Sequence, residues 1–284
     1  IEAVRQRLAE LDIQTLPPSP LRFGTVLHIA GAQRTPSCLP IVELLTDVMS
    51  VEQVSAMSIN GTVVQEMFNC RDDDADWGRK CQRVTVKIME KMTEKAALCS
   101  ESGLSAIFDL CGNLQLDALR VAFRRFGDAI AASQHVRRSM FFLLSSRRVG
   151  WPGGEENEAT LHQVMDLTDE ELFDDAEHTT LRMTRSGLPA SAIIRVLKHP
   201  VNADHHHGSS ARGSNVLHGI AMTGREELLD EVMPYITPAY LEQRHGYYGH
   251  TPLEIARRQY DRTGEEVYLR LAGRLQTFVK SAVD

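Results

Sequence analysis

The chain has 284 residues, of which 43% are hydrophobic and 24% are charged, a balance that supports a folded core and excludes wholesale disorder. The net charge of −7 argues against a protein that binds nucleic acid by neutralising phosphates, because such binding needs an excess of Lys and Arg. No stretch reaches the roughly 18 uninterrupted apolar residues of a membrane span, so we expect no membrane segment. The five cysteines, odd in number and without C-x-x-C spacing, favour reduced thiols and hence a cytoplasmic protein.

The N-terminal residues 1–19 are expected to form a helix followed by a proline-rich linker. The linker cannot continue the helix, because proline lacks an amide donor and clashes with the preceding turn. A glycine-rich and proline-containing break at 150–154 divides the rest of the chain. We therefore expect one helical array in two halves, residues 20–149 and residues 150–284.

One short pattern recurs along both halves: a small or polar residue, an apolar pair and then a helical run. Ser or Thr at the opening accepts a hydrogen bond from an otherwise unpaired amide of the first turn, and proline at the first helical position costs no hydrogen bond. The pattern therefore predicts that a helix starts at each copy. The copies begin at Gly24, Gly61, Gly103, Ala159, Ser214 and Gly249.

A second helix is predicted after most copies, because apolar residues recur there at the spacing that buries one helix face. The segment 71–79, rich in Asp, is expected to be an acidic loop, and the polar segment 204–210 a flexible one. A turn at 187–189 is expected to lead into one of these second helices, at 193–197. The other second helices are expected around residues 39–45, 84–92, 116–126, 226–229 and 266–272.

The recurring pattern resembles the ankyrin repeat, whose signature is T-P-L-H-x-A. The copy at 251–256 reads T-P-L-E-I-A, so only Glu254 departs from the signature. The copy at 25–30 reads T-V-L-H-I-A, and the copy at 214–224 continues through the family's inter-helix turn. The gaps on either side of Leu161 are much longer than the family's spacing, which predicts inserted loops or an extra helix.

The resemblance implies an all-α fold, an ankyrin-like solenoid of stacked helix–turn–helix repeats with long inserted loops. It implies a non-enzymatic protein–protein interaction module, a scaffold or adaptor, that binds a protein partner through its concave face and finger loops and takes no small-molecule substrate. The histidines of three copies, His28, His162 and His218, are expected to be architectural, bonding to the backbone of the adjacent repeat.

Two alternatives stay open. The chain could be the targeting or substrate-recruiting domain of a larger enzyme, or of a secreted bacterial effector that acts in the host cytoplasm. It could also be a different helical array, similar to HEAT repeats, which the long gaps between copies would suit.

The candidate partner-binding residues are Arg34, Arg212, Arg244, Tyr247 and Tyr248. The last three lie at 243–250, where an ankyrin repeat places its finger loop. Tyr and Arg provide a large contact area at low entropy cost. The glycines of the same segment fit a purely structural turn equally well. A stretch of interleaved Arg and Phe within 120–148 suits a solvated helix face, an acidic partner or nucleic acid.

We expect no catalytic residue, no metal site and no cofactor. The five cysteines are odd in number and show no C-x-x-C spacing, so they do not match a zinc site. We expect these cysteines to be buried and to pack as small hydrophobic residues. Residues 205–207 are three consecutive histidines. Side chains of consecutive residues do not readily converge on one metal ion, so we expect this segment to be an exposed loop without a metal. Acidic clusters at 72–74, 155–156 and 174–175 are expected to be solvated. Motifs for activated serine or for phosphate binding are absent, which leaves Cys111 as the least implausible nucleophile.

Overall fold

The computed structural model describes Gln6 and residues 24–68, 75–98, 105–146, 154–168, 176–198 and 214–281. The chain divides into two compact units, Ile1–Leu143 and Leu144–Asp284. In the described residues every regular element is helical, apart from one isolated bridge between Ser58 and Gly61. The predicted all-α class is therefore confirmed. None of the described helices is long and apolar enough to cross a lipid bilayer.

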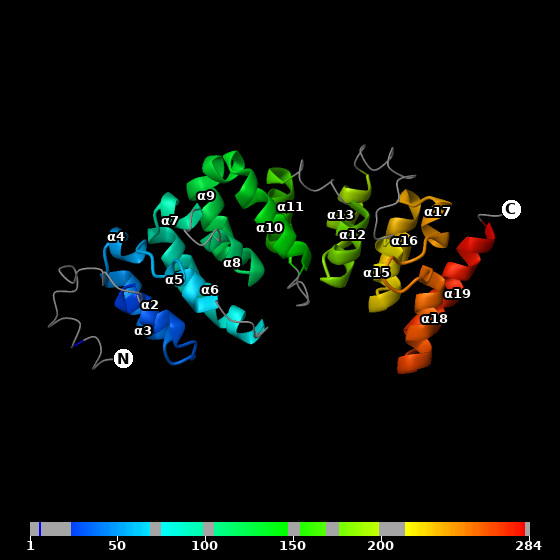
Figure 1. Ribbon diagram of the computed structural model, residues 1–284, viewed down its shortest axis with the longest axis horizontal. Helices are drawn as coiled ribbons and strands as arrows, with labels where there is room; N and C mark the ends of the chain where they lie inside the picture. The colour runs from blue at the N-terminus through cyan, green and yellow to red at the C-terminus, as the bar shows by residue number, and fades with distance from the viewer. Residues whose placement is uncertain are drawn as a thin grey trace. The chain divides into compact units, whose positions relative to one another are not determined.

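The first unit consists of pairs of successive helices. First helices pack against one another in the order α2, α5, α8, and second helices in the order α3, α6, α9 (Figure 1). Each pair thus buries its apolar side mainly against the next pair rather than around one common centre. The pairs are α2 (Val26–Ala32) with α3 (Leu39–Val48), α5 (Val63–Phe68) with α6 (Ala75–Lys91), and α8 (Ala106–Gly112) with α9 (Leu116–Ala132); α4 (Val51–Val54) and α7 (Glu94–Leu98) lie between pairs, and α10 (Gln134–Ser146) follows.

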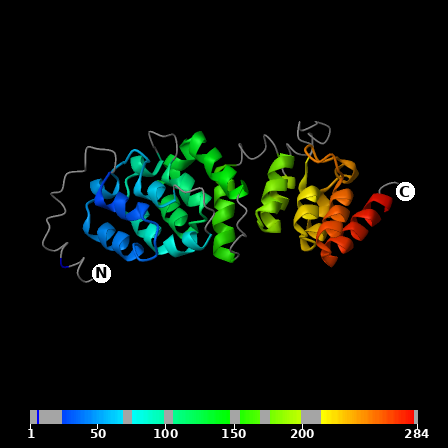
Figure 2. The same cartoon turned by 60° about the horizontal axis from the view of Figure 1, so that its bottom comes forward.

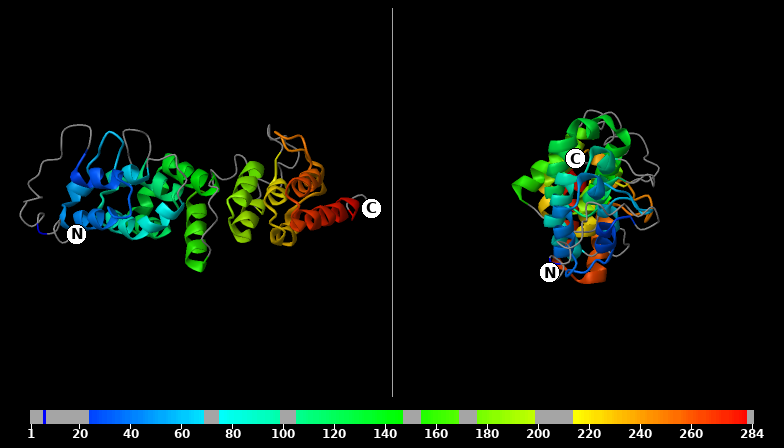
Figure 3. Two further views of the ribbon diagram at one scale, coloured as in Figure 1. Left: turned by 90° about the horizontal axis from the view of Figure 1, so that it is seen from below. Right: turned by 90° about the vertical axis from the view of Figure 1, so that its left-hand side faces the viewer.

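The second unit repeats this plan (Figures 2 and 3). Its first helices α12, α15 and α18 pack in that order, and the second helix α13 packs on α16. Ion pairs from Arg270 and Arg274 of α19 to Glu226, which precedes α16, join the last two pairs. The elements are α11 (Glu155–Leu167), α12 (Ala176–Arg185), α13 (Ala190–Leu197), α15 (Val216–Thr223), α16 (Glu227–Val232), the 3-10 helix η2 (Met233–Tyr235), α17 (Pro238–Glu242), α18 (Pro252–Thr263) and α19 (Glu266–Ser281).

Four of the first helices, α2, α5, α15 and α18, start where the recurring pattern predicts and share the same reciprocal cap. The amide of the residue before the helix donates a hydrogen bond to the side chain three residues later, which fixes the entry of the chain into the helix. His, Gln or Glu serves equally as that acceptor. The pairs are Thr25 with His28 (3.1 Å), Thr62 with Gln65 (2.7 Å), Asn215 with His218 (3.1 Å) and Thr251 with Glu254 (3.0 Å).

Small residues let adjacent first helices approach closely. A Cβ at Gly31 would stand 3.1 Å from atoms of Val63 and Met67, so α2 and α5 meet at this glycine. A Cβ at Gly219 would stand 2.8 Å from the Cβ of Thr184, so α15 meets α12 in the same way. Glycine thus permits the close approach of α2 to α5 and of α15 to α12.

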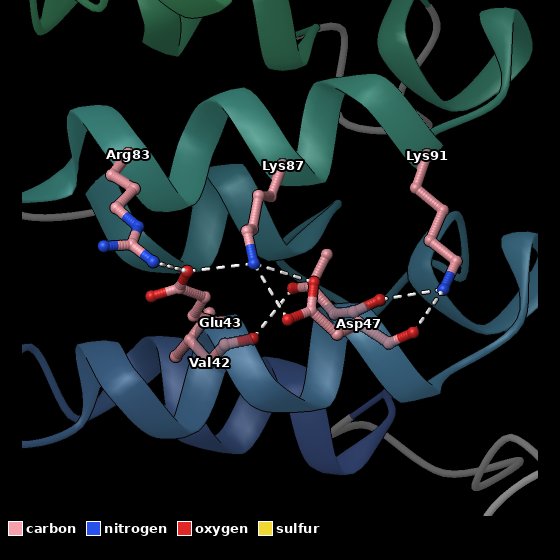
Figure 4. Close-up of polar contacts among 7 residues, drawn as sticks. Val42, Glu43, Asp47, Arg83, Lys87 and Lys91 are labelled. Atoms are coloured by element: carbon pink, nitrogen blue, oxygen red, sulfur yellow. Dashed lines mark hydrogen bonds and ion pairs between the residues drawn. The ribbon is translucent and has the colours of Figure 1, made fainter.

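A network of ion pairs joins α3 to α6 on the surface of the first unit (Figure 4). Glu43 lies 2.7 Å from Arg83 and 2.9 Å from Lys87, and Lys87 also lies 2.8 Å from Asp47. The hydrogen bond from Lys87 holds the pKa of Glu43 below its ordinary value. Because Arg83 and Asp47 are exposed and Glu43 and Lys87 are only half-buried, the network specifies alignment more than it adds stability.

Basic side chains also tie neighbouring pairs together by donating to carbonyls at helix C-termini. Carbonyls of the last turn lack a partner in their own helix and carry a partial negative charge, so a cation from the adjacent pair satisfies both needs. The bonds are Lys91 to the Thr46 carbonyl of α3 (2.9 Å), Arg34 to the Glu66 carbonyl of α5 (3.2 Å), Arg125 to the Met89 carbonyl of α6, and Arg225 to the Thr184 carbonyl of α12 (3.3 Å).

Two predictions about helix positions are wrong. The copy at 159–162 does not start a helix, because α11 begins at Glu155 and Thr160 donates to the Glu156 carbonyl inside it. The expected acidic loop at 71–79 is in part helix, since α6 begins at Ala75. The proline-rich linker, the break at 150–153, the histidines of 205–207, Cys70 and Cys99 lie outside the described residues.

Candidate partner-binding loop

The loop at 243–250, between α17 and α18, is the candidate site in the second unit. Its ends are closed by a hydrogen bond from the His245 amide to the His250 carbonyl, at 2.8 Å. Inside it, the Gly249 amide donates to the His245 carbonyl at 2.7 Å, and Gly249 has a left-handed φ of 67° that favours glycine. The backbone therefore forms a tight, well-bonded turn. We call it the finger loop.

The ring of His245 holds the finger loop from within. Its side chain is buried, and its Nδ1 accepts hydrogen bonds from the amides of Tyr247 (3.1 Å) and Tyr248 (3.3 Å). The ring also meets His218 of α15 edge-on, with centroids 5.4 Å apart. Because Nδ1 must keep its lone pair to accept these amides, the observed turn requires an unprotonated Nδ1.

Tyr247 and Tyr248 project from the tip of the finger loop. Their side chains are 85% and 55% exposed, far more than is usual for large aromatic residues. The two rings are perpendicular with centroids 4.9 Å apart, and Tyr248 also packs on His245 at 4.8 Å. The result is a small aromatic surface whose backbone is already fixed before any partner arrives.

Arg244 lies beside this aromatic surface. Its Nη1 donates to the Gly249 carbonyl at 2.8 Å and lies 3.5 Å from Glu254 of α18. The Thr251 amide, and then the charges of Arg244 and His250, hold the pKa of Glu254 below its ordinary value. Arg244 stays exposed, so its remaining donors face solvent at the edge of the loop.

The finger loop is anchored to α15 of the neighbouring pair. Asn215 donates to the Tyr240 carbonyl at 3.0 Å, and the Gly246 amide donates to Ser214 at 3.4 Å. The Nε2 of His218 lies 3.3 Å from the His250 carbonyl, in the adjacent pair. Burial, and then the proximity of His245, lowers the pKa of His218 to about 4. His218 is therefore neutral at physiological pH and architectural, as predicted.

The other two predicted histidines differ from each other. His28 is buried, and its Nδ1 accepts from the Thr25 amide. Burial lowers its pKa, while Glu66 and the backbone of Gly61, both in the next pair, oppose this shift. His162, by contrast, is half-exposed in the middle of α11, near Ser191 (3.3 Å) and Glu158 (3.8 Å). The Ser191 hydroxyl donates directly to Glu158, and both groups lie near the same nitrogen, Nε2, of His162. A catalytic triad needs the serine and the carboxylate on opposite nitrogens of the ring, so these three residues do not form one.

The structure brings together Arg244, Tyr247 and Tyr248 of the predicted partner-binding residues. Arg34 belongs to the first unit, where its guanidinium donates to the Glu66 carbonyl and its φ is 49°. That geometry gives it a structural role, and it is only half-exposed. Arg212 lies outside the described residues.

The first unit carries a comparable loop that sequence reasoning missed, at 55–61 before α5. The carboxylate of Glu66, itself buried, accepts from Ser58 (2.7 Å) and Asn60 (3.0 Å). This leaves Ile59 66% exposed and Met57 37% exposed at the tip. The Asn-Gly dipeptide at 60–61 is the signal that could have predicted the turn.

Two of the described cysteines have thiols that burial keeps in their neutral form. Cys81 and Cys111 are buried as predicted, and burial raises the pKa of Cys81 to about 12 and that of Cys111 further. In the Arg- and Phe-rich stretch, Arg125 packs over the ring of Phe126 at 4.7 Å. No group of His, Cys, Asp and Glu that could hold a metal ion is found within the part of the chain that the structure describes.

Comparison of the chain with protein-family models, with curated protein sequences and with solved structures finds no match.

Proposed function

We propose that the chain is an ankyrin-like solenoid that serves as a non-enzymatic protein–protein interaction module. The stacking of first helices on first helices in each unit supports this architecture, as do the reciprocal cap at four helix starts and the turns projecting between pairs. A solenoid of this kind offers an extended surface for a macromolecular partner rather than a closed pocket for a small molecule.

We place the partner contact on the finger loop of the second unit. The observation that carries this proposal is the pair of exposed, adjacent rings of Tyr247 and Tyr248 on a backbone fixed by His245. Tyrosine buries a large area in an interface with few rotamers to lose, and a preformed loop adds no ordering cost. Arg244 at the edge of the loop adds donors for carboxylates or carbonyls of the partner.

The test is capture of proteins by the full chain, compared between variants by quantitative mass spectrometry. Tyr247→Ala combined with Tyr248→Ala is expected to lose the proteins that the unsubstituted chain retains. Leu269→Ala is the matched control, because Leu269 is 47% exposed on α19, outside the finger loop, and its truncation removes a similarly exposed apolar side chain. Retention of the same proteins by the double variant would refute the proposal.

A further inference from the structure

The turn that closes the loop 55–61 contains the sole Asn-Gly dipeptide of the chain, Asn60-Gly61. Asparagine followed by glycine is the dipeptide most open to spontaneous deamidation, because glycine has no side chain to hinder attack by its own amide nitrogen. In that reaction the Gly61 nitrogen loses its proton and bonds to the side-chain carbonyl carbon of Asn60, and ammonia leaves. Water then opens the cyclic imide to aspartate or isoaspartate, so water is added and ammonia is lost without any oxidant or reductant.

The closed loop holds both reacting groups in place. The Gly61 amide donates to the Ser58 carbonyl at 3.1 Å. The Nδ2 of Asn60 donates to both carboxylate oxygens of Glu66, at 3.0 and 3.1 Å. An amide whose hydrogen is bonded loses its proton less readily, because the bond stabilises the neutral form, and a side-chain amide fixed on a carboxylate cannot turn toward the backbone. Although Asn60 is exposed to water, the closed loop therefore delays its deamidation.

Glu66 fixes Asn60 by attraction, and deamidation turns this attraction into repulsion. The carboxylate of Glu66 is buried, and among the residues that the structure describes its side-chain donors are the Ser58 hydroxyl, at 2.7 Å, and the Asn60 amide. The reaction replaces that amide by a second carboxylate, and two carboxylates at hydrogen-bond distance repel unless one of them takes up a proton. Isoaspartate also lengthens the backbone of the turn by one carbon. At neutral pH the product therefore cannot restore the closed loop.

We propose that Asn60 is a site of spontaneous deamidation, that Glu66 delays the reaction, and that the product keeps the loop 55–61 open. The change is irreversible, because ammonia is lost to the solvent. It alters the surface around Met57 and Ile59, which the closed loop leaves 37% and 66% exposed at its tip. The first unit thus carries a one-way chemical change that depends neither on the finger loop nor on any partner.

The first test follows deamidation of the full chain at mildly alkaline pH, by peptide mass spectrometry with detection of isoaspartate. The folded chain should react at Asn60 about ten- to a hundredfold more slowly than the chain unfolded in urea, because the reaction waits for local opening of the loop. Glu66→Ala should raise the folded-state rate by about tenfold, whereas Glu52→Ala, which removes an exposed carboxylate of α4, should leave it unchanged. Equal rates in the folded and unfolded chain, no acceleration by Glu66→Ala, or no product in the folded chain after about ten half-lives of the unfolded reaction would overturn the proposal.

The second test addresses the product. Asn60→Asp places the aspartate product at an exposed position, so the unit should stay folded by circular dichroism while amide hydrogen exchange at 57–61 rises by about tenfold or more. Asn60→Ala, which removes the donor without adding charge, should speed that exchange less. Protection of 57–61 in Asn60→Asp equal to that in the unsubstituted chain would overturn the proposal, because the product would then fit the closed loop.

Discussion

Replacing Gly219 by alanine tests the close approach of α15 to α12. In an isolated helix this substitution is favourable, because alanine loses less backbone entropy than glycine, by about 1 kcal/mol. In the structure the new Cβ would stand 2.8 Å from Thr184 Cβ, 3.1 Å from its Cγ2 and 3.2 Å from the Leu181 carbonyl oxygen. None of these contacts is with the end of a flexible chain.

Thr184 cannot turn away from the new methyl group. It is buried, β-branched, and held by a hydrogen bond from its hydroxyl to the Thr180 carbonyl at 2.8 Å. The two helices must therefore separate, and overpacking of this kind costs about 1–3 kcal/mol. After the gain in helix propensity, we expect Gly219→Ala to lower the free energy of unfolding by about 1 kcal/mol.

Gly273→Ala is the matched control. Gly273 lies inside α19, is exposed, and would place its Cβ with nothing within 4 Å. We expect a gain of about 0.5–1 kcal/mol there. Urea unfolding of the full chain, with hydrogen exchange resolved for α15 and α19, measures both effects. If both substitutions stabilise the protein equally, α12 and α15 are not packed as described.

Three further predictions concern polar groups. His218→Gln keeps a cap acceptor of the kind found at Gln65. The pKa of His218 is about 6.5 in the unfolded chain and about 4 in the folded chain, so the stability of the unsubstituted protein should fall as the pH drops through this window, by about 3 kcal/mol at pH 4. The variant should lose that part of the pH dependence when its stability is measured by urea unfolding. Arg225→Ala should cost about 1–2 kcal/mol, because it leaves the Leu188 carbonyl without its donor and removes one of the two donors to the Thr184 carbonyl, the other being the Gly187 amide. Arg262→Ala, at an exposed residue of α18, should change stability by less than about 0.5 kcal/mol. Glu66→Ala should speed hydrogen exchange at 57–61 and lower stability by about 1–2 kcal/mol, and unchanged exchange there would contradict the carboxylate's role in the loop.

Helix starts were predictable from the sequence wherever a local cap fixes them. Thr25, Ser105 and Thr251 each stand before a helix whose first turn needs an acceptor, and helices begin there as predicted. The same argument gave a wrong helix start at Thr160, because the Thr160 hydroxyl donates to a carbonyl inside α11 instead of capping the first turn of a helix. Whether a threonine opens a helix depends on the preceding residues, and Gly154 opens α11.

The position of the finger loop was predictable from the sequence, but the contacts that hold its conformation were not. Glycine and tyrosine at 243–250 indicated an exposed turn, and Tyr247 and Tyr248 are exposed. The role of His245 could not be inferred, because it depends on the fold of the turn and on contact with His218 across thirty or so residues. The buried carboxylate of Glu66 was missed for the same reason. The binding of a partner by this loop stays a prediction.

The most direct test of the account is a calorimetric titration of a captured partner with the unsubstituted chain and with Tyr247→Ala combined with Tyr248→Ala. Aromatic residues at the centre of an interface each contribute about 1–2 kcal/mol or more, so the account predicts a dissociation constant about a hundredfold higher for the double variant, and no change for Leu269→Ala. An unchanged dissociation constant for the double variant, with α15 and α18 still protected from exchange, would contradict it.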